Sequence, residues 1–102
     1  HGPYIHYYPD GTIESKEIYF YGYKKGEAMT YFDDGTPKIQ CYYLLDELHG
    51  EYIEYYENGK IKKKEQYLNG KLDGLSEYYN SDTSIDKKVW HFNGEVYGIV
   101  KN

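Results

Sequence analysis

The stretch GEYIEYYENGKIKKKEQYLNGKLD, residues 50–73, is one copy of a repeat, and its features indicate the architecture of the whole chain. Glycine recurs at intervals of 24 residues, and the other segments align with residues 50–73 on that spacing. The recurring glycines are Gly2, Gly26, Gly50, Gly74 and Gly98. The sequence therefore predicts a single repeat domain over residues 1–102. Its units are residues 2–25, 26–49, 50–73 and 74–97, with a partial unit at 98–102.

Two kinds of turn signal recur along the chain, each in three of the four units. Asp10-Gly11, Asp34-Gly35 and Asn58-Gly59 align, and such dipeptides tolerate positive φ, so they predict two-residue hairpin turns. A second turn is marked by Gly22, Gly70 and Gly94, with Asp46 in the place of glycine in unit two. The fourth unit has NSDTS, residues 80–84, at the first turn, which indicates a capping or bulged repeat.

The segments between the turns predict strands. They are roughly 8–10 residues long, rich in Tyr, Ile and Thr, and lack helical periodicity. Glycine at 26, 50 and 74 predicts a kink or bulge where the chain passes to the next hairpin. The predicted fold class is all-β: an elongated antiparallel meander of repeated hairpins in an open, largely single-layer twisted sheet.

Strict alternation along residues 60–68 predicts which side chains share a face. One face would carry Ile61, Lys63, Glu65 and Tyr67, and the other Lys62, Lys64, Gln66 and Leu68. Neither face is a continuous apolar stripe, which also favours an open sheet.

The composition indicates how the side chains pack. Hydrophobic residues make up 39% of the 102 residues, and sixteen tyrosines supply much of this. Tyrosine suits half-buried positions, with its ring packed and its hydroxyl in water. The columns Tyr7, Tyr31, Tyr55 and Tyr19, Tyr43, Tyr67 are therefore expected to stack between neighbouring strands, mostly as core. Net charge is −5 without any arginine, which makes a nucleic-acid partner unlikely.

No residue pattern indicates catalysis, a cofactor or a metal site. The histidines, His1, His6, His49 and His91, fall in different units and lack metal-ligand spacing, so they are expected at the surface or in turns. Cys41 is expected to be a small half-buried side chain rather than a nucleophile. The carboxylates are scattered, and no glycine-rich phosphate loop is present. The sequence predicts a protein that is not an enzyme.

The segments GEAMTYFDDG, GEYIEYYENGKI and YLNGKLDG resemble MORN repeats, and more closely the variant MORN repeat of about 24 residues found in many bacterial proteins. The resemblance implies a row of β-hairpins and a scaffold role with protein contacts, or sometimes phospholipid association. Some bacterial relatives are classed as antitoxins. Similar repeats accompany the catalytic domain of plant phosphatidylinositol-phosphate kinases, but 102 residues of repeat leave no room for that domain.

The favoured function is protein–protein interaction, as a scaffold or antitoxin-like module. Unit two carries five acidic residues against one lysine, so it favours a basic partner. The candidate contact face comprises Glu27, Tyr31, Asp33, Asp34, Tyr52, Tyr55 and Tyr56. Self-association through open sheet edges is an alternative.

Two ligand alternatives remain open. Anionic phospholipid could bind Lys60, Lys62 and Lys64, although neighbouring glutamates neutralise that unit. The tyrosine-rich texture is also similar to choline-binding repeats, but those need recurrent tryptophan cages and Trp90 stands alone.

The compartment stays open between cytoplasm and cell envelope. No apolar run approaches the roughly 18 residues needed to cross a bilayer, and no signal peptide is visible. The chain begins with His1 rather than Met, so further repeats are expected on one or both sides.

Overall fold

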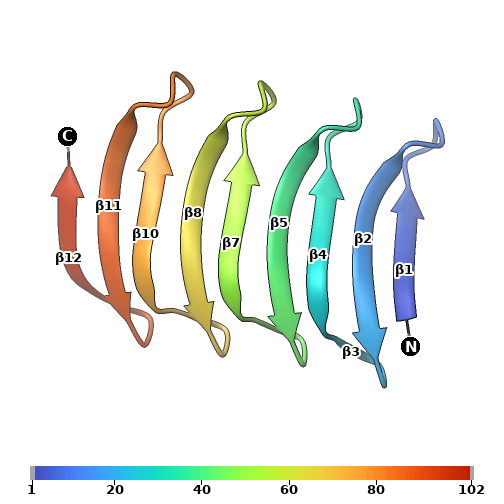
Figure 1. The fold of residues 1–102 in the computed structure, drawn as a ribbon, viewed down its shortest axis with the longest axis horizontal. Helices are drawn as coiled ribbons and strands as arrows, with labels where there is room; N and C mark the ends of the chain where they lie inside the picture. The colour runs from blue at the N-terminus through green and yellow to red at the C-terminus, as the bar shows by residue number, and fades with distance from the viewer. Residues whose placement is uncertain (1, 102) are drawn as a thin grey trace.

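The computed structural model describes residues 2–101 and arranges them in one antiparallel sheet (Figure 1). The strands are β1 (Gly2–Tyr7), β2 (Ile13–Phe20), β3 (Tyr23–Lys24), β4 (Gly26–Tyr31), β5 (Pro37–Leu44), β6 (Glu47–Leu48), β7 (Gly50–Tyr55), β8 (Ile61–Leu68), β9 (Lys71–Leu72), β10 (Gly74–Tyr79), β11 (Ile85–Phe92) and β12 (Glu95–Lys101). The predicted all-β meander of hairpins is confirmed.

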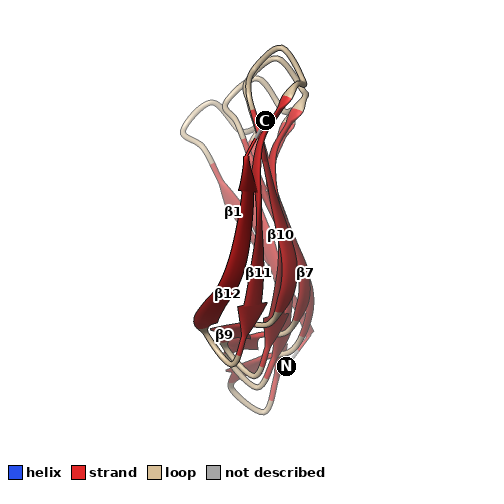
Figure 2. Ribbon diagram, turned by 90° about the vertical axis from the view of Figure 1, so that its left-hand side faces the viewer, coloured by secondary structure: helices blue, strands red, loops and turns tan. Residues whose placement is uncertain are grey.

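The long strands lie side by side in chain order, β1-β2-β4-β5-β7-β8-β10-β11-β12. The two-residue strands β3, β6 and β9 pair with the ends of β2, β5 and β8. The sheet measures 41 × 32 × 13 Å, and Figure 2 shows it edge-on as a single bowed layer. Its radius of gyration is 15.0 Å, whereas a globule of this length has about 13 Å. The protein is thus a thin plate in which strand neighbours supply most of the burial.

The first turn of each unit differs from the two-residue turn predicted for it. Tyr8 N–H donates to Thr12 O at 2.7 Å and Gly11 N–H donates to Tyr8 O at 2.9 Å, which encloses three residues. Asp10 does not adopt positive φ, whereas Gly11 has φ +93°. The two-residue prediction was wrong because the Asp10 carboxylate accepts hydrogen bonds from the N–H (2.9 Å) and hydroxyl (2.7 Å) of Thr12, which favours a three-residue turn. The turns at Gly35 and Gly59 have the same backbone hydrogen bonds.

The second turn of each unit is the two-residue type. Asn69 and Gly70 have φ of 51° and 83°, and Leu45 and Asp46 have 49° and 70°. Positive φ at both central residues matches the twist of the flanking strands. Asp46 compensates for its strain, since its carboxylate accepts the Lys24 N–H at 2.7 Å.

The fourth unit keeps the geometry of the first turn despite its different sequence. Thr83 takes the place of glycine with φ +76°, and its N–H donates to Asn80 O at 2.9 Å. The predicted change to a bulged or capping turn is therefore absent at this site. Instead, a β-branched residue occupies a left-handed conformation that costs roughly 1–2 kcal/mol.

We expect Thr83→Gly to raise the free energy of unfolding by about 1 kcal/mol, because glycine relieves this strain. The reciprocal change Gly59→Thr should lower it by about the same amount. Gly59 has φ +87° and open space around its Cβ position, so the loss would be conformational and not steric. Urea unfolding measures both changes. A less stable Thr83→Gly variant would contradict the prediction.

The glycines that open units two to four produce the predicted bulge. Gly26, Gly50 and Gly74 have φ of 110°, 88° and 103°. Lys24 pairs with Tyr19, but Met29 pairs with Lys16, so the strand gains two extra residues at Gly26. The bulge lets one continuous chain serve first as a short return strand and then as the next long strand.

Neighbouring units are tied together at both ends of the strands. At the second turns, the N–H groups of Asp46, Gly70 and Gly94 donate to carbonyls of the preceding unit at 2.8–2.9 Å. At the first turns, Tyr8 Oη donates to Tyr31 O at 2.6 Å and Tyr56 Oη donates to Tyr79 O at 2.8 Å. Phe32, at the equivalent place in unit two, has no hydroxyl to make this bond.

We expect Tyr56→Phe to cost about 1 kcal/mol of unfolding free energy, because one inter-unit hydrogen bond is lost. Phe32→Tyr should stabilise by a similar amount if its hydroxyl reaches the Tyr55 carbonyl. Thermal and urea unfolding measure the pair. Equal stability of all three proteins would show that these hydroxyls gain nothing over water.

The two faces of the sheet differ, and we name one after Glu65 and the other after Met29; a central row of side chains crosses each face. The Glu65 face carries His6, Ser15, Thr30, Ile39, Glu54, Lys63, Tyr78, Lys87 and Lys101 in that row. The Met29 face carries Ile5, Lys16, Met29, Gln40, Ile53, Lys64, Glu77, Lys88 and Val100.

The core lies on the Glu65 face. The buried side chains, Ser15, Ala28, Cys41, Glu65, Ser76 and Val89, all belong to that face by strand alternation. Cys41 is 6% exposed, so the expectation of half burial was wrong: it lies in the middle of the sheet beside Ala28. Tyr7 is 59% exposed at the edge strand, whereas the other tyrosines of both predicted columns are half-buried.

Candidate functional site

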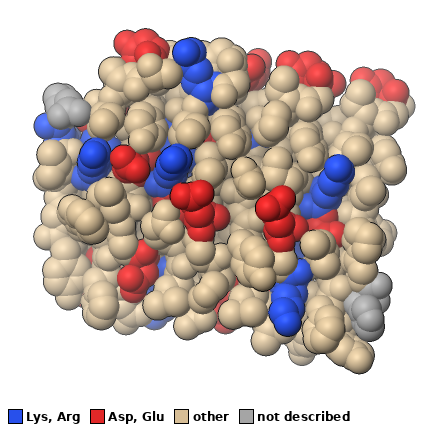
Figure 3. Space-filling view, viewed as in Figure 1, with Lys and Arg blue, Asp and Glu red and all other residues tan. Residues whose placement is uncertain are grey.

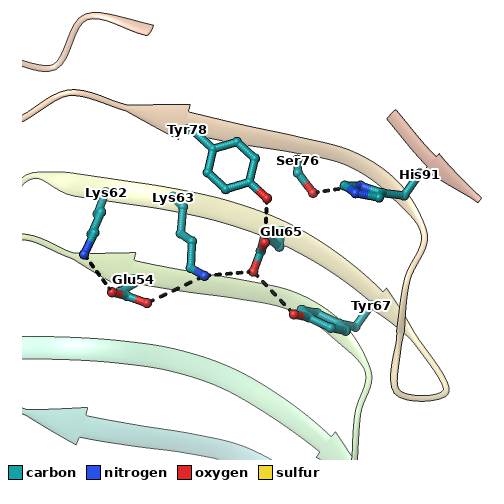
Figure 4. Close-up of polar contacts among 8 residues, drawn as sticks. All are labelled: Glu54, Lys62, Lys63, Glu65, Tyr67, Ser76, Tyr78 and His91. Carbon is teal, nitrogen blue, oxygen red and sulfur yellow. Dashed lines mark hydrogen bonds and ion pairs between the residues drawn. The ribbon is translucent and has the colours of Figure 1, made fainter. Parts of the chain in front are cut away.

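A polar cluster occupies the Glu65 face between the third and fourth units (Figure 4). Glu65 lies in the middle of β8 and is only 4% exposed. Tyr78 Oη donates to Glu65 Oε2 at 2.7 Å, and Tyr67 Oη donates to Oε1 at 3.4 Å. Lys63 Nζ lies 3.4 Å from Oε1. The buried carboxylate is thus satisfied by three partners, as a buried charge must be.

Lys63 extends the cluster towards the first turn. Its ammonium lies 3.9 Å from Glu54, and Lys62 reaches the same carboxylate at 3.4 Å. The register shift between Glu54 and Tyr55 interrupts strict alternation here, so the expectation that Lys62 and Lys63 point to opposite faces was wrong. Lys63 also lies over the Tyr52 ring, 5.4 Å from its centroid.

The pKa values of two tyrosines reflect the burial of their hydroxyls on the Glu65 face. Burial, helped by the hydrogen bond to Glu65, raises the pKa of Tyr78 from 10.0 to about 12. Burial, helped by the charge of Glu54, raises the pKa of Tyr52 to about 12 as well. Because its acceptors are occupied, Glu65 is arranged as a structural anchor between β8 and β10 and not as an exposed base.

These shifts predict loss of stability in alkali. The unfolded chain ionises its tyrosines near pH 10, whereas folded Tyr52 and Tyr78 resist ionisation until about pH 12. Their stabilising contribution is complete below pH 10 and declines as the pH rises towards 12. Tyrosinate absorbance should show a late-titrating group that Tyr78→Phe diminishes. Full titration of every tyrosine near pH 10 in the folded protein would refute this.

The first unit repeats the motif in a more open form. Glu17 accepts a hydrogen bond from Tyr19 Oη at 2.9 Å and lies 3.4 Å from Lys24 and 3.9 Å from His6. In units two and four the Glu17 position is taken by Cys41 and Val89. Carboxylate units therefore alternate with apolar units along the sheet.

Among the described residues, the three histidines and the cysteine have separate surroundings. His6 lies near Glu17, His49 Nδ1 accepts the Asn69 N–H at 3.4 Å, and His91 Nδ1 lies 3.3 Å from Ser76 Oγ. His1 lies outside the described residues. Burial raises the pKa of the Cys41 thiol, which disfavours the nucleophilic thiolate. Within residues 2–101, no three His, Cys, Asp or Glu side chains converge to hold a metal ion.

The Met29 face carries two adjoining shallow grooves. The first, which we call the Tyr42 groove, has a volume of about 210 Å³ and is lined by Glu27, Gln40, Cys41, Tyr42, Glu51 and Ile53. The second has a volume of about 350 Å³ and is lined by Pro3, Ile5, Lys16, Glu17, Ile18, Glu27 and Met29. Glu27 lines both, so the grooves run together across strands β1 to β7.

The Tyr42 groove has an acidic and apolar character. Glu27 and Glu51 are exposed, and among the described residues neither side chain has an ion-pair or hydrogen-bond partner. Tyr42 lies between them and is 43% exposed. Next to the groove, Ile5 and Ile18 are 40% and 43% exposed. The surface thus combines uncovered apolar side chains with carboxylates that lack partners.

The predicted partner-contact residues do not form one surface. Glu27 lines the Tyr42 groove, and Tyr31 and Tyr55 contact Lys16 and Gln40 on the same Met29 face. Tyr52 lies on the opposite face beside Lys63. The remaining predicted residues, Asp33, Asp34 and Tyr56, lie at or beside the first turns.

The lysines of the phospholipid alternative are also dispersed. Lys60 is exposed beside the first turn of unit three, and Lys62 is paired with Glu54. Lys64 belongs to the Met29 face, where it is paired in register with Glu77. Figure 3 shows acidic side chains gathered along the edge made by the first turns, where the sequence places Asp10, Asp33, Asp34, Glu57 and Asp82. The structure brings no basic patch together at these lysines.

Several residues of both sites were missed in the sequence. Glu51 was detectable, because Glu27 and Glu51 each follow a repeated glycine directly. Among the partners of Glu65, Lys63 and Tyr67 were expected on its face from strand alternation, but Tyr78 was missed, because it comes from the next hairpin and its place depends on the strand register.

The architecture defines a class before any comparison: an open, single-layer β-repeat protein built from 24-residue hairpin units. The family model described as "MORN repeat variant" matches residues 1–20 and 48–69. These two segments are therefore similar to MORN repeats of the variant type. They cover the hairpins of units one and three, and the structure shows the same hairpin in units two and four.

Comparisons with curated proteins and with solved structures found no significant match. In the described part of the chain, no helix is long and apolar enough to cross a membrane.

Proposed function

We infer that this chain is a non-enzymatic repeat module that binds a basic protein partner on its Met29 face. The observation that carries the proposal is the pair of adjoining grooves, where the exposed side chains of Tyr42, Ile5 and Ile18 lie near two carboxylates that lack partners. Exposed apolar patches rimmed by polar groups mark interaction sites. A scaffold role and an antitoxin-like role would both use such a contact.

The charges of the groove favour a basic partner over a membrane or an acidic one. The lining of the Tyr42 groove holds Glu27 and Glu51 and no basic side chain. Carboxylates at a contact site attract basic groups and speed their encounter at low salt. An anionic lipid surface would be repelled by the same charges.

The two faces offer a matched test by photocrosslinking in lysate of the source cells. A photoreactive residue would replace Tyr42 on the Met29 face or, as the control, Tyr4 on the Glu65 face; these tyrosines are 43% and 56% exposed. We expect position 42 to capture a basic protein and position 4 not to do so. Glu27→Lys together with Glu51→Lys should abolish the capture, because the attraction becomes repulsion.

Capture at position 4 alone would refute the proposal, since it would place the partner on the other face. Capture at position 42 that survives both charge reversals would refute the basic character of the partner. Unfolding curves of the variants would show that the sheet is intact.

A further inference from the structure

We propose that the Tyr42 groove binds an extended segment in polyproline II conformation, with basic residues three positions apart, running across the strands. This inference rests on the proposed function and names the chemistry of the partner. It follows from the geometry of the groove and from the spacing of its two carboxylates.

The first step is the spacing of the charges. Glu27 on β4 is paired in register with Tyr42 on β5, and Glu51 on the next strand, β7, lines the same groove. Neighbouring strands are about 4.8 Å apart, so the two carboxylate positions are separated by about 10 Å. Both glutamates occupy the same place in their units, directly after a repeated glycine, so this spacing is the pitch of the repeat.

The second step is the match of this pitch to a ligand backbone. A polyproline II segment rises about 3.1 Å per residue with three residues per turn, so side chains three apart lie on one side at about 9 Å. In a β-strand, residues three apart point to opposite sides. The repeat pitch therefore favours basic side chains at positions i and i+3 of a polyproline II segment.

The third step is the shape of the surface. The two adjoining grooves cross β1, β2, β4, β5 and β7, a span of about 19 Å. Six residues of polyproline II cover about the same length. The two rows of side chains that flank the groove are separated by two residues along each strand, a distance of about 7 Å. A slender chain fits this width, whereas an α-helix is about 10–12 Å across.

The fourth step is the chemistry of the groove floor. Tyr42 and Ile53 line the groove, and Met29 lines the adjoining one. Prolines of polyproline II segments dock on aromatic and apolar surfaces of this kind. The preformed conformation of such a segment also lowers the entropy lost on binding. Apolar contacts on Tyr42 and ion pairs to Glu27 and Glu51 can therefore form together.

The test uses capped proline hexapeptides that carry two lysines, titrated into the intact chain at low salt and followed by NMR. We expect the peptide with lysines three residues apart to bind at least about threefold more tightly than one of equal composition with adjacent lysines. Resonances of Glu27, Tyr42 and Glu51 should move most. Raising the salt concentration should weaken the binding, because the charges are exposed.

Matched variants locate the contact. Glu27→Gln and Glu51→Gln should each weaken binding by about threefold. Glu57→Gln removes the same charge from a first turn, and it should leave affinity unchanged. All three positions are exposed, so the fold should tolerate the changes.

Four results would overturn the proposal. The first two are equal affinity for both lysine spacings and resonance shifts confined to the Glu65 face. The other two are tighter binding of a helical peptide with lysines seven residues apart and concentration-dependent resonance shifts at the groove without any peptide. The last result would mean that a second copy covers the groove. If crosslinking at position 42 succeeds while peptide spacing has no effect, the protein-binding function stands and the polyproline II inference falls.

Discussion

The thickness of a single layer is the constraint on which the rest of the structure depends. The sheet is 13 Å thick, so each side chain can be covered by its neighbours within the sheet but not by a second layer. Large aliphatic residues gain little in such a place, whereas tyrosine packs its ring laterally and keeps its hydroxyl in contact with water or a carbonyl. The abundance of tyrosine and the small set of buried residues follow from this geometry.

Because the sheet is a single layer, contacts between neighbouring units hold it together. The backbone bonds from Asp46, Gly70 and Gly94 tie each second turn to the preceding unit, and they recur in every unit pair. The side-chain contacts do not recur equally. Units one and three carry Tyr4 with Glu17 and Tyr52 with Glu65, but units two and four carry the smaller pairs Ala28 with Cys41 and Ser76 with Val89. Large polar pairs thus alternate with small ones, which leaves room for the tyrosine rings. The family matches fall on the hairpins of units one and three.

The sequence was enough to predict the repeat, the strands and the bulges, because glycine and turn residues act locally. It was insufficient where two local preferences compete. Asp10-Gly11 is compatible with a two-residue turn, but the hydrogen bonds from Thr12 to the aspartate decide for three residues. Unit three has the same three-residue turn at Gly59, followed by a register shift between Glu54 and Tyr55, and Lys62 joins Lys63 at Glu54 there. Alternation placed Lys63 and Tyr67 on the face of Glu65, but Tyr78 comes from the next unit, so a view of one unit could not supply it. Of the candidate contact residues, the sequence located Glu27 and missed the two grooves that it lines, because the lining of the two grooves together comes from five strands.

The two faces differ in whether their carboxylates have partners within the sheet. On the Glu65 face, carboxylates are satisfied internally: Glu65 by two tyrosines and Lys63, and Glu54 by two lysines. The free-energy cost of removing water from these carboxylates is already offset by their partners. A ligand could therefore bind them only by breaking these contacts. On the Met29 face, Glu27 and Glu51 keep their full capacity to accept hydrogen bonds from a partner. Because strand alternation separates the two sets of side chains, the Met29 face can change its ligand chemistry without loss of the contacts that hold the sheet together.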